Sequence, residues 1–245
     1  LSVGPPFFNM AFTPFMLILG LLLPFGSMLA WKRGSASRVA RQLAPAFFLA
    51  LALLGLTWVL QTGRSLLGPM GVFLGAWLIG GAATDLISRT GQNRDWSRLR
   101  RLPRADWGKS IAHAGLGITM LGIAGLTAWE QEDIRVAQIG EPFEVAGFEL
   151  ELLGVEEIQG PNYYATQGEV AIRSDGEEIA HLFPQKRNYP VAQMPTTEAA
   201  IDYRFLRDLY VVIGDEQSGG GWVIRTYLKP LANWIWGGAI LMALG

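Results

Sequence analysis

The sequence predicts an α-helical polytopic membrane protein with an inserted, small all-β extracytoplasmic domain, built as a sandwich or a partly open barrel. Half of its 245 residues are hydrophobic, and the mean hydropathy is +0.26. Several uncharged apolar runs approach the ~20 residues that a membrane-spanning helix needs. A later stretch of about 100 residues alternates apolar and polar side chains instead, as half-buried strands do.

Residues 1–129 are expected to form a membrane domain with about four transmembrane helices. The short segment before the first helix contains Pro5 and Pro6 and is expected to be a non-helical loop. Residues 229–245 are apolar up to the last residue, and residue 1 is Leu, so we expect a truncated last transmembrane helix and a chain that is a piece of a longer protein. The four expected helices are Phe12–Trp31, Ala44–Leu60, Pro69–Ser88 and Lys109–Trp129.

Basic residues gather in two of the short loops. Four lie in residues 31–43 and seven in residues 89–109, whereas residues 61–68 carry one. Short loops rich in Lys and Arg stay in the cytoplasm, so we expect the N-terminus and residues 130–228 on the outer side, the latter as a periplasmic domain. That outer segment holds 18 of the 21 acidic and 7 of the 20 basic residues, a net charge of −11 against +10 for the remainder. Attraction to an anionic inner leaflet explains the positive charge of these loops better than nucleic-acid binding does, because the sequence has no nucleic-acid recognition module.

The polar segment 130–228 is expected to fold as short antiparallel strands. The Asp175–Gly176 pair between two apolar–polar stretches is a strong signal for a tight hairpin. Many short strands without a helical period favour a small sandwich or barrel. The expected strand regions are Phe143–Leu153, Gly168–Phe183 as two strands, Asp208–Gly214 and Trp222–Leu228.

The chain contains no cysteine and two histidines. The absence of cysteine excludes disulfides, thiolate zinc sites and cysteine nucleophiles in this chain. Walker and dinucleotide motifs are also missing, which makes nucleotide-driven chemistry unlikely on sequence grounds. His181 lies in the second strand of the predicted hairpin, and without a second ligand at metal spacing it is interpreted as a half-exposed strand residue.

His113 is the candidate functional residue because it lies in an otherwise apolar, membrane-spanning segment. An ionisable group there is expensive and marks a functional site by default. Gly117, one turn further on the same face, leaves room either for a flat ligand or for a closely packed helix. Three interpretations remain open from the residues alone: a hydrogen bond to another helix, a proton relay with Asp85, or an axial bond to haem iron.

Seven motifs, in order along the chain, resemble one family. They match the C-terminal portion of the CcmF/NrfE-like cytochrome c-type biogenesis proteins, the haem lyase subunits of bacterial cytochrome c maturation. The motifs are Val3–Asn9, Ala112–Ile118, Gly160–Ile172, Leu182–Pro190, Thr196–Ile201, Asp208–Asp215 and Trp222–Gly245.

The resemblance implies a multi-pass protein of the bacterial inner membrane that helps attach haem to apocytochrome c. It implies a haem chaperone, apocytochrome c and other lyase subunits as partners, and an intramembrane haem b as cofactor. His113 matches one of the family's two membrane haem ligands, with Gly117 packing beside the haem, whereas His181 matches none of the family's histidines. The tryptophan-rich outer loop, its two histidines and the second membrane ligand are absent, so the chain alone is expected to be inactive as a lyase.

Two functions of other classes remain as alternatives. A transporter of haem or a small solute would need a polar pathway, for which Asp85 and His113 alone are poor candidates. A membrane-anchored binding module would place all function in the periplasmic domain, and the helices would serve only to hold it.

Overall fold

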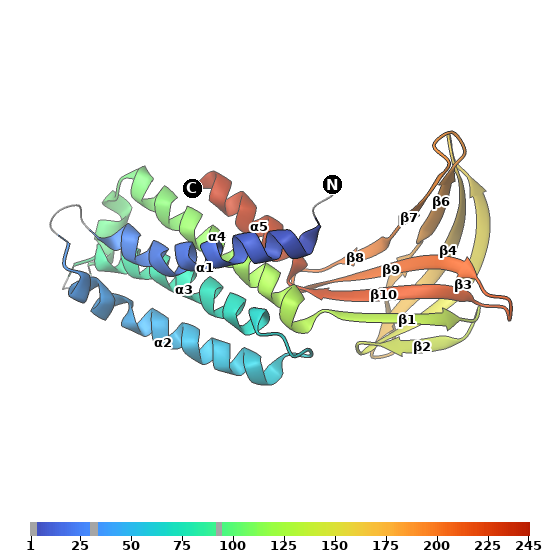
Figure 1. Ribbon diagram of the computed structural model, residues 1–245, viewed down its shortest axis with the longest axis horizontal. Coiled ribbons are helices and arrows are strands. Elements are labelled where there is room, and N and C mark those ends of the chain that lie inside the picture. Colours follow the sequence, from blue (N-terminus) through green and yellow to red (C-terminus); the bar gives the residue numbers. More distant parts are fainter. Residues whose placement is uncertain (1–3, 30–33, 92–94) are drawn as a thin grey trace. The chain divides into compact units, whose positions relative to one another are not determined.

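The computed structural model describes residues 4–29, 34–91 and 95–245 (Figure 1). The chain divides into two compact units: a helical unit of Leu1–Trp129 with Leu231–Gly245, and a β unit of Glu130–Pro230. Of the residues named in the sequence predictions, Val3, Trp31 and part of each basic loop lie outside the described residues.

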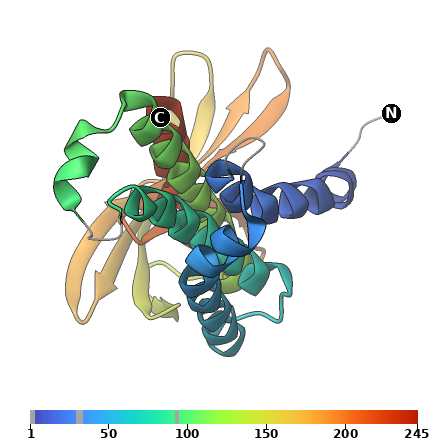
Figure 2. The same ribbon diagram turned by 90° about the vertical axis from the view of Figure 1, so that its left-hand side faces the viewer.

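Five α-helices form the helical unit (Figures 1 and 2). Four of them are long and apolar enough to cross a membrane, and α5 is shorter. A 3₁₀ turn, Trp96–Arg101, lies in the basic connection before α4. The helices are α1 (Pro5–Met28), α2 (Ala36–Leu60), α3 (Leu67–Ser88), α4 (Arg104–Trp129) and α5 (Ala232–Leu244).

Several helix boundaries differ from the sequence prediction, and the first residues of α1 and α2 differ most. The expected loop around Pro5 and Pro6 is wrong, because α1 begins at Pro5 with the prolines in its first turn. Proline is well tolerated there, since the first amides of a helix have no intrahelical acceptor. The helix α2 begins eight residues earlier than expected and includes Arg38 and Arg41, because arginine is a good helix former and does not end a helix when it reaches the interface.

The β unit consists of two antiparallel sheets packed face to face. The first has the strand order β1–β10–β9–β8, and the second has the order β2–β3–β4–β6–β7 with β5 also paired to β4. Asp175 and Gly176 both have positive φ angles, 52° and 82°, as the predicted tight hairpin between β4 and β5 requires. The strands are β1 (Gln131–Ala137), β2 (Pro142–Val145), β3 (Phe148–Gln159), β4 (Tyr164–Ser174), β5 (Glu177–Leu182), β6 (Gln185–Tyr189), β7 (Met194–Glu198), β8 (Ala200–Tyr203), β9 (Arg207–Glu216) and β10 (Trp222–Pro230).

Alternate residues of both sheets meet in one apolar core. Leu150 and Val170 come from the second sheet, Leu209 and Ile224 from the first, and all four are fully or almost fully buried. This is the inward alternation of a sandwich. The predicted fold class, apolar membrane helices with a small β-sandwich, is confirmed.

Truncating this core should loosen the β unit. We expect Leu150→Ala to lower the free energy of unfolding of the β unit by about 2–5 kcal/mol, because Leu150 is fully buried and the cavity cannot fill with water. Hydrogen–deuterium exchange of β3 and β4 in the purified protein measures the change. Val191→Ala is the matched control, because Val191 is 99% exposed; equal exchange in the two variants would contradict the assigned core.

Candidate functional site

The helix that carries His113, α4, is held on one side by close contact with α3. A Cβ atom at Gly71 of α3 would lie 2.8 Å from the Ala124 Cβ, and one at Gly75 would lie 2.8 Å from the Gly117 carbonyl oxygen. Conversely, a Cβ at Gly117 would lie 2.7 Å from the Gly75 oxygen. Small residues therefore let the two backbones approach closely, as in tightly packed membrane helices.

The opposite side of α4 packs just as closely against α5. A Cβ at Gly115 would lie 2.7 Å from the Gly238 carbonyl oxygen, and one at Gly122 would lie 2.7 Å from the Ile235 nitrogen. Thr119 also donates a hydrogen bond to the Ile235 carbonyl oxygen at 3.3 Å. Because α3 and α5 contact α4 on opposite sides, the rotation of α4 about its own axis is fixed.

His113 lies at the edge of a third face of α4, between the two packed faces. Lys109 is one turn before it and Met120 two turns after it on this face, at about 1.5 Å per residue along the helix. His113 is half-buried. Further along the same face, Met120 lines an apolar groove of about 500 Å³ between α1, α3 and α4. His113 is therefore one turn before Gly117, the residue whose backbone contacts α3.

Four charged side chains form a network at the end of α4 nearest His113. Asp85 of α3 is 4% exposed. Its Oδ2 lies 2.6 Å from the Lys109 Nζ, and its Oδ1 accepts a hydrogen bond from the Arg89 Nε at 3.3 Å. The Arg89 guanidinium also reaches the Asp106 Oδ2 at 2.8 Å. Two carboxylates and two cations thus compensate one another, as burial in an apolar bundle requires.

The same network extends to α1. The Lys109 Nζ donates a hydrogen bond to the Ser27 carbonyl oxygen at 3.2 Å, near the C-terminal end of α1. Lys109 therefore joins three helices: α4 by its backbone, α3 through Asp85 and α1 through Ser27. The sequence alone does not predict this network, because Asp85 and Arg89 lie on or next to α3 whereas Lys109 and Asp106 lie on α4.

His181 lies on β5, on a surface of the β unit rich in carboxylates. Its Nε2 lies 3.1 Å from the Glu169 Oε1, and its ring stacks on Phe183 with 5.5 Å between the ring centroids. Glu178, three residues before His181 on β5, is 3.7 Å from the Nδ1. In the described part of the chain, groups of three or more His, Asp or Glu that could hold a metal ion are absent, which agrees with a strand residue paired to glutamate.

Comparison with known proteins shows which family this chain resembles. Residues 128–230 match the family described as "CcmF C-terminal beta-sandwich". A cytochrome c-type biogenesis protein, ccl1 of Rhodobacter capsulatus, is 54% identical over 245 residues, which is all of this chain and 37% of the relative. Residues 128–230 thus belong to the CcmF C-terminal domain family, and the whole chain is similar to cytochrome c-type biogenesis proteins of this kind.

Other CcmF proteins agree along the whole chain. CcmF of Pseudomonas aeruginosa is 35% identical over 247 residues, covering all of this chain and 37% of that protein. A solved structure named "Cytochrome c Heme Lyase CcmF" superimposes with a TM-score of 0.73 at 26% identity, covering 98% of this chain and 39% of that one. The chain therefore spans less than two fifths of the length of these CcmF relatives.

Proposed function

We propose that this chain is part of a CcmF-type haem lyase, in which His113 is one axial ligand of an intramembrane haem b. Such a haem, when bound, supplies one-electron redox chemistry. The relatives are named for cytochrome c biogenesis, and one solved structure is named a haem lyase. The second ligand, the tryptophan-rich loop and the remaining lyase machinery would come from parts of the protein outside this chain.

The character and place of His113 support this proposal. A neutral imidazole is a common haem ligand, and His113 is half-buried on α4. The small-residue contacts with α3 and α5 fix the direction of the side chain, which a metal ligand needs. Gly117 is in contact with α3, so its proposed place beside the haem stays a prediction.

The proposed orientation places the basic helix ends in the cytoplasm. Arg38 and Arg41 lie in the first turns of α2, and the connection before α4 carries Arg98, Arg100 and Arg101. Positive residues near short loops are retained on the cytoplasmic side. The β unit follows the C-terminal end of α4 and precedes the N-terminal end of α5, so it would lie on the other side of the membrane, in the periplasm. There it would meet the haem chaperone, apocytochrome c and the other lyase subunits.

The haem content of a histidine variant tests this proposal. We expect His113→Ala in the full-length protein to remove the b-type absorption bands, because the iron loses an axial ligand. His181→Ala is the matched control, since the chain has two histidines and His181 is paired with glutamate on β5. Unchanged b-haem per folded protein in His113→Ala, measured as the pyridine haemochrome, would refute the assignment.

A further inference from the structure

One end of the β-sandwich is open and polar inside. Along β9 the inward positions are Leu209, Val211, Ile213 and then Asp215, so the apolar sequence stops at Ile213. On β4 the inward positions after Val170 are Gly168 and Thr166. The apolar core thus ends where Ile213 lies against Gly168, with 2.9 Å between the Ile213 Cδ1 and the position of a Cβ at Gly168.

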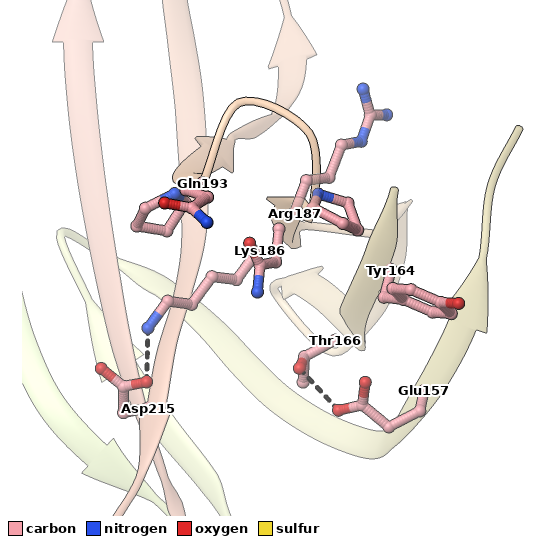
Figure 3. A pocket seen from close by; sticks show the side chains of 10 residues that line it. Glu157, Tyr164, Thr166, Lys186, Arg187, Gln193 and Asp215 are labelled. Atoms are coloured by element: carbon pink, nitrogen blue, oxygen red, sulfur yellow. Dashed lines mark hydrogen bonds and ion pairs between the residues drawn. The ribbon is translucent and has the colours of Figure 1, made fainter. Parts of the chain in front are cut away.

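Beyond that point an open hollow lies along the second sheet, with Asp215 of the first sheet in its wall. Its volume is about 690 Å³, in the range of sites that bind small molecules or short chain segments. Residues from both sheets contribute to its wall, as Figure 3 shows. They are Glu157, Tyr164, Thr166, Lys186, Arg187, Asn188, Pro190, Gln193, Pro195 and Asp215.

The charges in the wall balance. Lys186 of β6 forms an ion pair with Asp215 of β9 across the opening between the sheets, and Thr166 donates a hydrogen bond of 2.6 Å to Glu157. The side chain of Arg187 is directed away from the Lys186–Asp215 pair (Figure 3) and lies over the Tyr163 ring. A hydrogen bond with Tyr189 raises the pKa of the Arg187 guanidinium, so Arg187 keeps its charge.

The rest of the wall offers neutral hydrogen-bonding groups below an apolar rim. Asn188 and Gln193 contribute amides and Tyr164 a hydroxyl, and all three residues are exposed. On the β6–β7 hairpin beside them, Val191 is 99% exposed and Met194 is 61% exposed. An amide side chain can donate and accept at once, and so matches the single donor and acceptor that each residue of an extended polypeptide presents.

This chemistry selects one class of ligand. Because Glu157 and Asp215 balance Lys186 and Arg187, the wall has no excess of positive charge to hold a phosphate or a nucleic acid. The described wall residues do not supply the three ligands of a metal site either. We propose that the hollow binds an extended segment of unfolded polypeptide, its backbone bonded to the amide groups and its apolar side chains against Val191 and Met194. Under the proposed function, on which this identification rests, that polypeptide is apocytochrome c, which is unfolded before haem attachment.

Filling the hollow tests the proposal. The probe is reduced, fluorescently labelled apocytochrome c, and its affinity for the full-length protein in nanodiscs is measured by anisotropy. Thr166→Trp should weaken binding by about tenfold or more, because the indole occupies the space between the sheets. The matched control is Ser174→Trp at the far end of β4, roughly 26 Å away at ~3.3 Å per residue. Equal affinity of the two variants would overturn the proposal.

A second variant covers the case in which Thr166→Trp fails to fold. Asn188→Ala with Gln193→Ala changes exposed side chains only and should still weaken binding by about three- to tenfold through lost hydrogen bonds. Wild-type affinity in this double variant would then overturn the proposal. A photo-crosslinker in place of Gln193 gives a further test. Crosslinking to the folded haem chaperone but not to apocytochrome c would also overturn the proposal.

The b-haem content, measured on the same samples, separates this inference from the proposed function. His113→Ala should bind apocytochrome c with wild-type affinity while lacking haem. If the wild-type protein binds apocytochrome c and Thr166→Trp binds it equally well, only the inference about the hollow is wrong. If the wild-type protein does not bind apocytochrome c and His113→Ala keeps its haem, the proposed function is wrong.

Discussion

Replacing Asp85 with alanine should destabilise the helical unit by about 3–5 kcal/mol, the usual cost of leaving a buried charge without its partner. Asp85 is 4% exposed and compensates both Lys109 and Arg89. Without this carboxylate, the partly buried Lys109 would lose its counter-charge and keep only the Ser27 carbonyl oxygen as a partner, and α3, α4 and α1 would lose their shared contact. Lys109 is one turn from His113, so the haem site should be lost together with the fold.

The melting temperature of the purified protein in detergent measures this loss. Arg98→Ala is the control, because it removes an ion pair with Asp95 in which both side chains are about half exposed, and it should leave the melting temperature close to that of the wild type. The double variant Asp85→Ala with Lys109→Ala should recover much of the loss, since removing both charges costs far less than removing one. A double variant no more stable than Asp85→Ala would show that the Asp85–Lys109 pair is not the cause.

Gly117→Val should separate α3 from α4 and destabilise the helical unit by about 1–3 kcal/mol or more. The reason is backbone contact: a Cβ at Gly117 would lie 2.7 Å from the Gly75 carbonyl oxygen and 3.1 Å from the Ile79 nitrogen. Backbone atoms cannot turn away as a flexible side chain can, so the helices themselves must move. This places the expected effect of Gly117 in helix packing, whether or not a haem is bound.

The matched control for Gly117→Val is Gly55→Val on α2. Both glycines lie inside membrane-spanning helices, but a Cβ at Gly55 meets no atom within 4 Å. Thermal unfolding in the same detergent should therefore show a clear decrease for Gly117→Val and little change for Gly55→Val. Equal melting temperatures would mean that α3 and α4 are not in close contact at this level.

Local pattern located the helices and one hairpin, but the single strand expected over Phe143–Leu153 is wrong, because a turn at Ala146–Gly147 divides it into β2 and β3. The apolar runs located four helices, and Asp175–Gly176 located the β4–β5 turn, because few other residue pairs adopt two consecutive positive φ angles. The ends of helices were predicted less well. Pro5 and Pro6 were taken as loop residues, although a proline in a first turn breaks no hydrogen bond.

The candidate site was predicted in part. His113 was singled out by its apolar surroundings, and its place on α4 follows from local sequence. The residues around His113 do not follow from local sequence. Lys109 contacts Asp85 because α3 and α4 are antiparallel in one particular register. Likewise, Glu169 pairs with His181 from the neighbouring strand β4, a contact that the local sequence around His181 does not predict.

By itself, the sequence determined which segments can lie in a membrane and where the β unit begins. It also determined that any chemistry of this chain uses at most two histidines and no thiol. Hydropathy and strand alternation are properties of contiguous residues, so a single amino-acid sequence is enough to show them. The tertiary structure alone decided that Asp85 compensates Lys109, that Gly117 serves the contact with α3, and that the sandwich stays open beyond Ile213. These are contacts between segments distant in the chain, and their distances are set by packing and register.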